Sequence, residues 1–327
     1  MKLIKSNSLK KVLHYAKPYQ KRFNWVIVWA ILLSIFAAAR PYLLKQTVDE
    51  YIKPEDKHGL LLYVVIMAVV LLLEVLAQFY FTYWANWLGQ DIIKDIRDKL
   101  FHHITSFKMK YFDTEPVGKL VTRSVSDIES IASIFSQGLF MIISDVLKMI
   151  IVIVFMLVVN WKITGIVLLI MPIILIATKI FNRKMKIAFK EVRNEVANLN
   201  TFVQERLTGI KIVQLFNREK IELEKFKEIN QKHNKAWLKN ILYNSIFFPI
   251  ADIISNISIG LVVYFGAIWI INGDTDTTIG QLVAFNMYIT MLYNPLRQIA
   301  DKFNVMQMGI VAADRVFEIL DTEENVQ

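Results

Sequence analysis

The chain has 327 residues, 55% of them hydrophobic, and a net charge of +9. It contains no cysteine, which excludes a disulfide framework and a thiolate metal site, and the sequence predicts no other metal site. A soluble chain of this length would form about two domains, but the long apolar runs indicate a membrane protein instead.

Residues 1–22 hold seven Lys/Arg and a weakly amphipathic pattern through Leu9, Val12, Leu13 and Ala16, which predicts a cytoplasmic elbow segment on the membrane surface. Apolar runs then predict six spans, each reaching the ~20 residues that cross ~30 Å of hydrocarbon. Their bounds are 23–44, 60–88, 138–160, 163–181, 246–271 and 281–311, the last interrupted by polar residues. A signal peptide is the alternative for the first run, which is too long for a signal core.

The distribution of basic residues predicts the orientation. Of the 38 Lys/Arg, 29 lie in the N-terminal arm, residues 89–137, residues 182–245 and the C-terminal tail, and only four lie in the connections 45–59, 161–162 and 272–280. The positive-inside rule therefore predicts a multi-pass protein of the cytoplasmic (inner) membrane with both termini in the cytoplasm. The charge is explained by topology and lipid contact, so we expect no nucleic-acid partner.

The predicted helices continue beyond the membrane. Ile92, Ile96, Leu100 and Ile104 keep the helical period to Ser106, about 27 Å past the second span. Two further amphipathic patterns flank the segment 201–219: Met185, Phe189, Val192, Val196, Leu199 and Val203 before it, and Leu223, Phe226, Ile229, His233 and Trp237 after it. The predicted fold is an all-α membrane protein whose six long helices extend into a cytoplasmic stalk with two turns at its tip.

The first turn is the stretch FDTEPVGKLVTRSVSDIE, residues 112–129. Asp113 or Thr114 suits an N-cap, Pro116 suits an early helical position, and Gly118 permits a sharp turn. Arg123 and Asp127 are four apart and predict an ion pair on one helix face. From these features alone, a capped surface turn is the favoured interpretation.

Together these features resemble the transmembrane domain of an ABC exporter of the multidrug or lipid-flippase type. The pattern FD-x4-G-x-L-x-x-R-x-x-x-D is similar to that family's first intracellular loop, and E-R-L-x-G-I-x-x-V-x-x-F-N-x-E, residues 205–219, is similar to the second. The tail AADRVFEILDTEE, residues 312–324, is similar to the segment that enters the linker to the ATPase domain. The resemblance covers essentially the whole chain.

The resemblance implies two coupling helices that fit grooves on nucleotide-binding domains. The first comprises Thr114, Glu115, Pro116, Val117 and Gly118, and the second runs from Ile210 to Arg218 and includes Gln214, Leu215, Phe216 and Asn217. It also implies the domain division 1–22 elbow, 23–320 transmembrane domain and 321–327 start of the linker.

The sequence has no G-x-x-x-x-G-K-[ST] phosphate-binding loop. We therefore expect no ATPase activity and no cofactor in this chain alone, with ATP and Mg on a nucleotide-binding domain that was removed or forms a separate chain.

Polar residues inside the spans indicate a solute pathway. The sixth span has one polar face, and the fifth carries a looser patch; the pathway candidates are Asn286, Thr290, Tyr293, Asn294, Arg297, Asp252 and Asn256. Asp145 and Lys148 are three apart, which predicts either a neutralising pair or a substrate contact. Glu74 is a further charge inside a span, and Arg40 is expected to reach the interface. Contacts between helices, without any solute, are the alternative explanation of the polar residues.

The sequence thus predicts one half of an exporter that moves an amphipathic or hydrophobic solute, a drug, lipid or peptide, by alternating access. Its expected partners are a second transmembrane half, identical or different, nucleotide-binding domains, membrane lipids and the solute. A channel or receptor-like scaffold with a cytosolic interaction stalk is the rival interpretation, although no charge ring or carbonyl filter is visible. A secondary transporter would show inverted repeats, and none is found.

Overall fold

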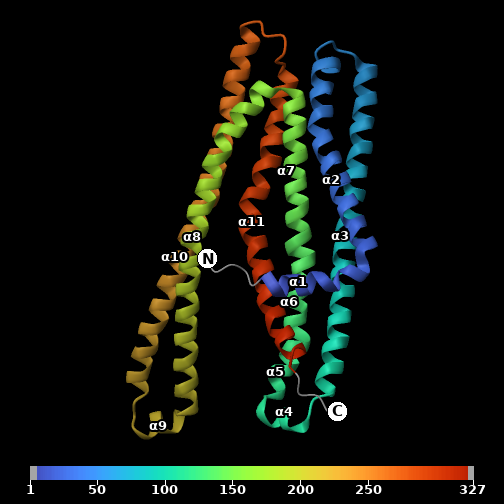
Figure 1. Ribbon diagram of the computed structural model, residues 1–327. Helices are drawn as coiled ribbons and strands as arrows, with labels where there is room; N and C mark the ends of the chain where they lie inside the picture. Colours follow the sequence, from blue (N-terminus) through green and yellow to red (C-terminus); the bar gives the residue numbers. More distant parts are fainter. Residues whose placement is uncertain (1–5, 323–327) are drawn as a thin grey trace. The chain divides into compact units, whose positions relative to one another are not determined.

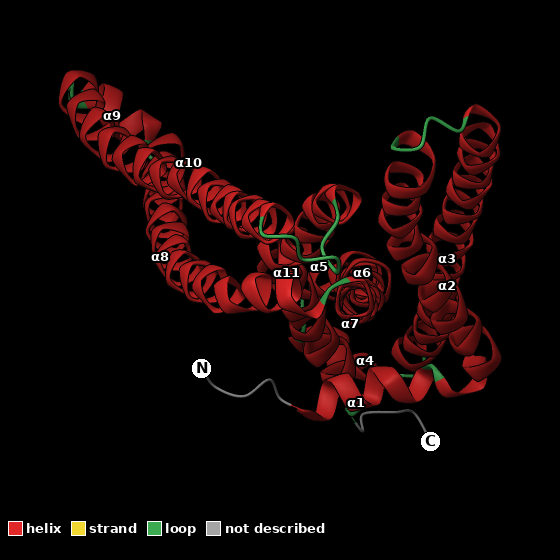
Figure 2. Cartoon of the chain, turned by 90° about the horizontal axis from the view of Figure 1, so that it is seen from above, coloured by secondary structure: helices red, strands yellow, loops and turns green. Residues whose placement is uncertain are grey.

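A computed structural model describes the backbone of residues 6–322 and the side chains from Lys10 onward, except that of Ala300. Every regular element in this range is a helix (Figure 2), so the predicted all-α fold class is confirmed. The chain forms two compact units: one of residues 1–165 and 262–327, and one of residues 166–261. Apart from Asp321 and Thr322, the predicted linker segment 321–327 lies outside the described residues.

The first unit is built from helices that follow one another with short connections (Figure 1). In chain order these are α1 (Ser6–Tyr15), a 3₁₀ turn (Lys17–Tyr19), α2 (Gln20–Gln46), a π-helical segment (Thr47–Ile52), α3 (Lys57–Thr105), α4 (Met109–Thr114), α5 (Val117–Thr122), a π-helical segment (Arg123–Asp127), α6 (Ile128–Ser133), a π-helical segment (Ile134–Leu139), α7 (Phe140–Val159) and α11 (Ile279–Leu320). The start of α8 (Trp161–Thr208) and the end of α10 (Glu219–Ile271) also belong to it.

Five helical runs in the described part are long and apolar enough to cross a membrane: 17–52, 57–105, 117–159, 161–208 and 219–271. They contain the first five predicted spans. The sixth predicted span lies in α11, which has 42 residues and is not one of these five runs. The prolines at 41, 172, 249 and 295 lie inside α2, α8, α10 and α11.

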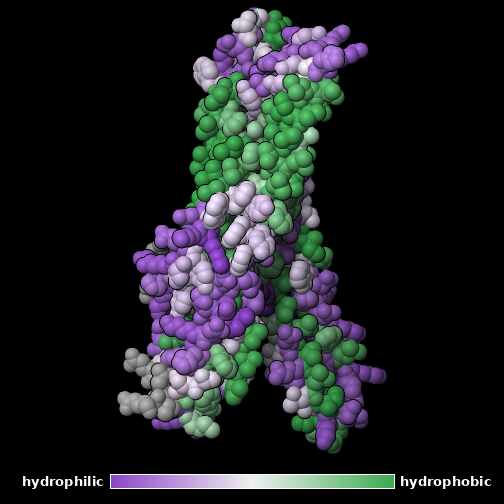
Figure 3. Space-filling view, turned by 90° about the vertical axis from the view of Figure 1, so that its right-hand side faces the viewer, coloured by the Kyte–Doolittle hydropathy of each residue, from purple (hydrophilic) through white to green (hydrophobic). Residues whose placement is uncertain are grey.

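The core of the first unit follows one face of α3. Asp56 caps this helix, since its side chain accepts hydrogen bonds from the backbone N–H groups of His58 and Gly59. Ile92, Ile96 and Leu100 are fully buried, as their helical spacing predicts. Earlier in α3 the outward face is apolar instead, and apolar side chains form a continuous band on the side of the unit where α2 and α3 lie (Figure 3).

The second unit consists of most of α8 and α10, joined by α9 (Ile210–Leu215). The two long helices contact each other along their length: Phe181 lies 5.7 Å from Phe247, and Phe202 lies 6.3 Å from Phe226, between ring centroids. Lys239 Nζ forms an ion pair of 2.8 Å with Glu191.

The predicted contact face of these helices is partly wrong. Phe189 and Val203 are exposed, whereas Ala188 is buried and Phe202 is partly buried. On α10 the same shift of one residue brings Ala236 inward and leaves Trp237 39% exposed. A repeat of three and four residues fits two adjacent helix faces equally well, and two closely packed helices place small residues at the point of contact.

Candidate coupling tips and polar face

The first tip, residues 109–129, contains a break where a helix was predicted. α4 ends at Thr114, Glu115 is extended with φ −108° and ψ 129°, and α5 begins at Val117. A proline disfavours the helical conformation in the residue before it, so Pro116 ends one helix at Glu115 and stands as the N-cap of the next. The predicted coupling helix Thr114–Gly118 is therefore a turn between two helices, and Asp113 and Thr114 end a helix instead of capping one.

Gly118 lies inside α5 and makes no sharp turn, because the bend falls at Glu115 and Pro116. Lys119 Nζ reaches back to the Glu115 carboxylate at 2.8 Å, which ties the first turn of α5 to the break.

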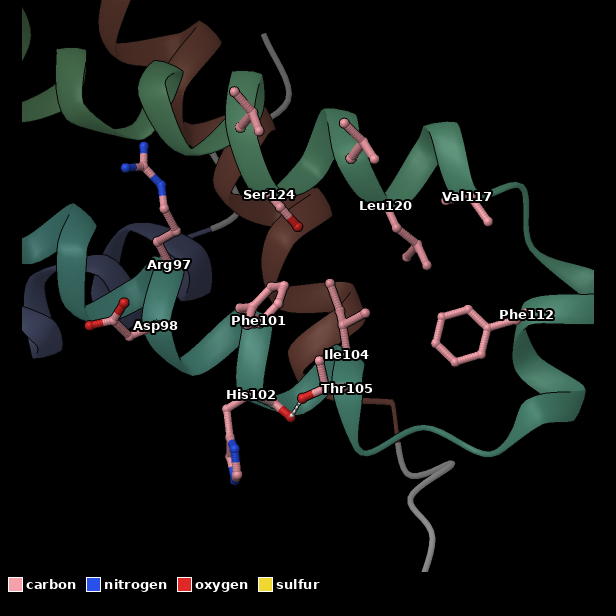
Figure 4. A pocket seen from close by; sticks show the side chains of 12 residues that line it. Arg97, Asp98, Phe101, His102, Ile104, Thr105, Phe112, Val117, Leu120 and Ser124 are labelled. Carbon is pink, nitrogen blue, oxygen red and sulfur yellow. Dashed lines mark hydrogen bonds between the residues drawn. The ribbon is translucent and has the colours of Figure 1, made fainter.

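An apolar pocket of about 720 Å³ lies between the last turns of α3 and α5 (Figure 4). Phe101, Val117 and Val121 line it and are more than half exposed, and Leu120 closes its base at 4% exposure. The sequence pattern did not indicate this pocket, because its two walls are about twenty residues apart along the chain and carry no shared motif.

The predicted ion pair of Arg123 and Asp127 is confirmed. Asp127 is only 7% exposed, and Arg315 of α11 approaches its other oxygen at 3.6 Å. The carboxylate thus joins the first tip to the last turns of α11, a contact between distant segments that local spacing does not predict.

The second tip, Gly209–Glu219, contains the short helix α9 as expected, although the helix ends at Leu215 instead of Arg218. Asn217 adopts a left-handed backbone with φ 49°, a conformation that asparagine tolerates better than most residues, and it reverses the chain into α10. Phe216 is 70% exposed, so it does not fold back between the stalk helices.

Exposed apolar side chains surround Phe216. Leu215 is 80% and Ile212 is 63% exposed, so the apolar surface of the second tip extends beyond Phe216. Behind them, Arg206 Nε donates to Glu222 at 2.6 Å and joins α8 to α10. This hydrogen bond holds the ends of α8 and α10 together next to the exposed apolar residues of the second tip.

α11 presents a polar face. Asn286, Thr290 and Asn294 are exposed at steps of four, and Asp301 continues the stripe, with Gln298 and Asn304 as further members that the prediction omitted. Tyr293, also predicted as a pathway candidate, is fully buried and so lies away from this face, whereas its neighbour Asn294 lies on it.

The other pathway candidates have separate settings. Arg297 is partly buried beside the α11 stripe, while Asp252 and Asn256 are exposed on α10 in the second unit. Asn256 Nδ2 donates to the backbone oxygen of Asp252 at 2.9 Å, an ordinary bond within a helix. The α11 candidates therefore form one surface, and Asp252 and Asn256 form another.

The predicted pair of Asp145 and Lys148 is wrong. Asp145 of α7 forms its ion pair with Lys302 of α11, and both side chains are mostly buried. Arg40 lies 3.5 Å from the Glu74 carboxylate of α3, so it pairs with a neighbouring helix instead of only reaching the interface. Both pairs join two different helices, and charges buried in this way are normally paired.

At the end of the first unit opposite the first tip, a polar cluster joins three connections. Asn160, the one residue between α7 and α8, accepts from the N–H groups of Lys162 and Ile163 and donates to Gln281 Oε1 at 2.9 Å. Asp49 accepts from the Thr278 hydroxyl at 2.6 Å and from Gly280 N at 2.9 Å. No sequence pattern indicated this cluster, because its polar members are far apart along the chain and follow no common period.

Comparison with known proteins agrees with this architecture. Residues 23–296 match the family model described as the ABC transporter transmembrane region. The chain is 27% identical over 97% of its length to an uncharacterized ABC transporter ATP-binding protein, YknV, and 28% identical over 95% to a putative multidrug export ATP-binding/permease protein, YgaD, both of Bacillus subtilis. It is 25% identical over 95% of its length to an ATP-dependent lipid A-core flippase of Syntrophus aciditrophicus.

The alignments cover 52%, 54% and 52% of these three relatives, so the chain spans about half the length of the curated proteins it matches. The matched region contains the predicted spans one to five, both tips and the first half of the polar face of α11, through Asn294. The chain belongs to the ABC transporter transmembrane region family, as its sequence motifs indicated.

Proposed function

We propose that this chain is the membrane-spanning half of an ATP-driven exporter that moves an amphipathic or hydrophobic solute out of the cytoplasm by alternating access. The observation that carries the proposal is the exposed apolar surface of the second tip, Ile212, Leu215 and Phe216, at the end of a long polar helix pair. Burying a Phe side chain is worth about 1.5–3 kcal/mol, so a partner that covers Phe216 gains this free energy.

The partner we infer is a nucleotide-binding domain, which would bind ATP and Mg and contact both tips. Closing of two such domains would move the tips, and α8 and α10 would transmit the movement to the membrane. The relatives support this proposal because their names include ATP-binding proteins, a multidrug exporter and lipid A-core flippases. The solute itself would contact the polar face of α11.

A second transmembrane half would complete the pathway, because one exposed polar face on α11 does not enclose a solute. We infer that both termini and both tips lie in the cytoplasm, at the inner membrane, since the connections near the tips hold most of the Lys/Arg.

The test is ATP-dependent uptake of a fluorescent amphipathic dye by inverted membrane vesicles that contain this chain with its nucleotide-binding domain. Phe216→Ala should abolish most ATP-dependent uptake and leave ATP hydrolysis largely intact, because the apolar contact that transmits movement is lost. Leu223→Ala is the matched control: Leu223 is 51% exposed on α10 but lies outside the tip, and its removal should preserve uptake.

Uptake by the wild-type vesicles that needs no ATP would contradict an exporter and favour the channel. Coupled uptake by the Phe216→Ala variant at the wild-type rate would contradict the docking role of the second tip.

A further inference from the structure

α1, the 3₁₀ turn after it and the start of α2 carry a basic surface. Between Lys10 and Arg22 the sequence has five Lys/Arg and no acidic residue. Two of the five are ion-paired, Lys11 with Asp321 at 2.5 Å and Arg22 with Asp91. The other three are exposed and form no ion pair within the described part of the chain: Lys10, Lys17 and Lys21. Three uncompensated positive charges therefore lie on a short surface segment.

Aromatic residues place this segment at a membrane boundary. Trp25, directly after the basic segment, is 53% exposed, and Trp87 of α3 is 37% exposed. The guanidinium of Arg22 lies 4.6 Å from the centre of the Trp87 ring, so the start of α2 and this part of α3 are at one level. Trp and Tyr gather where the hydrocarbon meets the headgroups, which places Lys17 and Lys21 among the headgroups.

The opposite side of α1 holds the last turns of α11. Val12 is fully buried, and the Tyr15 ring stacks on Phe317 with centroids 6.0 Å apart. Lys11 Nζ lies 5.5 Å from the centre of the same Phe317 ring while it pairs with Asp321. α1 crosses the bundle beside the start of α2 (Figure 1), so this one helix lies at the level of the headgroups and also contacts the end of α11.

We propose that the segment Lys10–Arg22, which runs from α1 through the 3₁₀ turn into the start of α2, binds anionic phospholipid of the cytosolic leaflet through Lys10, Lys17 and Lys21, and that this binding holds the last turns of α11 in place through Lys11 and Tyr15. A lysine near an anionic leaflet strengthens binding about fivefold, so three lysines strengthen it about 100-fold. The three lysines are separated by seven and four residues along a helix and a turn, a spread that suits a fluid layer of headgroups better than one small anion.

Hydrogen exchange of the whole chain in lipid nanodiscs tests the proposal. The discs contain phosphatidylcholine alone or phosphatidylcholine with phosphatidylglycerol. In the anionic discs we expect amide exchange to slow at least fivefold in residues 10–16 of α1 and in residues 312–320 of α11. Soluble glycerophosphoglycerol, added to neutral discs, should have no such effect, which distinguishes a leaflet from a free phosphate ester.

Two variants separate lipid binding from its transmission to α11. The triple variant Lys10→Gln, Lys17→Gln, Lys21→Gln should lose the lipid response in both segments. Lys11→Gln with Asp321→Asn should keep the response in α1 and lose it in α11. The matched control removes the same number of positive charges from the second unit through Lys211→Gln, Lys220→Gln and Lys232→Gln. Its amide exchange should slow in anionic discs as much as that of the wild type.

Equal exchange of the wild type in both kinds of disc would overturn the proposal, as would a full lipid response in the triple variant. Thermal melting in neutral discs checks that each variant is folded. If the triple glutamine variant fails to fold, the three single substitutions are measured instead, and each should weaken the slowing of exchange in anionic discs. Unchanged slowing in all three single variants would also overturn the proposal.

Discussion

Gly280 is a single residue on which the contact between α2 and α11 depends. A Cβ atom there would lie 2.5 Å from the Lys45 carbonyl oxygen and 2.7 Å from the Asp49 side chain. Its N–H also donates to Asp49 at 2.9 Å. Gly280→Ala should therefore lower the free energy of unfolding by about 1–3 kcal/mol, because either the backbone or Asp49 must move. Thermal melting in detergent or nanodiscs measures the loss.

Gly165→Ala is the control for that experiment. Gly165 lies inside a helix, and a Cβ atom there would have no neighbour within 4 Å. Alanine in a helix interior is better than glycine by roughly 0.5–1 kcal/mol, so this variant should melt at the same temperature or slightly higher. Equal melting of the two variants would show that Gly280 has more room than the contact distances indicate.

Asp274, in the connection between α10 and α11, makes the stability of the fold depend on pH. The pKa of Asp274 lies below its ordinary value of 3.8, because Lys162 donates a hydrogen bond to its carboxylate and the backbone N–H of Asp276 donates another. A lowered pKa in the folded state stabilises the fold above the unfolded value, and this stabilisation is lost as the pH falls through the folded value.

The melting difference between wild type and Asp274→Asn should thus be constant at neutral pH and shrink as the pH falls below 3.8. Asp276→Asn provides the comparison, since the Asp276 side chain is 76% exposed and lies 3.8 Å from Lys162. Asp276→Asn should shift the melting temperature less than Asp274→Asn at every pH above the folded-state pKa of Asp274. A difference for Asp274→Asn that persists unchanged at the lowest pH would contradict the ion pair.

Between helices, the ion pair of Asp145 and Lys302 is the contact whose loss is expected to cost most. Both side chains are mostly buried, at 23% and 17% exposure. Asp145→Ala should lower the free energy of unfolding by about 3–5 kcal/mol, because it leaves the Lys302 ammonium buried without a partner. The double variant Asp145→Ala, Lys302→Ala should recover much of this loss, which a double-mutant cycle measures.

Lys148→Ala tests the pairing suggested by spacing alone. Lys148 lies on the same helix as Asp145, three residues on, yet the structure pairs Asp145 with α11. Lys148→Ala should lower the free energy of unfolding far less than Lys302→Ala does. A coupling energy near zero between Asp145 and Lys302, together with a large coupling energy between Asp145 and Lys148, would show that Asp145 pairs with Lys148 instead.

In the whole molecule, the polar face of α11 should meet water while the apolar face of α3 meets lipid. The chain has no cysteine, so single cysteines report accessibility without background. Thr290→Cys should react with a water-soluble maleimide in membranes, and Leu72→Cys, although Leu72 is 63% exposed, should not. Similar reactivity at both positions would contradict a water-lined α11.

Crosslinking in the same membranes addresses the second half. If another chain encloses the α11 face, amine-reactive crosslinkers should yield species of at least twice the mass of the chain. A chain found only as a monomer in membranes would contradict the paired pathway.

The sequence by itself determined the features that depend on neighbours along the chain. Apolar runs long enough to satisfy their backbone hydrogen bonds inside lipid become helices, which is why the spans and the buried face through Ile92, Ile96 and Leu100 could be predicted. The ion pair of Arg123 and Asp127 was predictable for the same reason, since i and i+4 side chains meet on any helix.

Only the tertiary structure decided which distant segments meet. Asp145 and Lys302 are 157 residues apart, and nothing local distinguishes Lys302 from Lys148 as the partner. Tyr293 and Asn294 differ by one residue, about 100° around a helix, so only the packing of α11 shows which one is exposed. The cluster of Asp49, Asn160 and Gln281 lies where helix ends and a connection meet, and its hydrogen bonds depend on how the helices are brought together and not on periodicity.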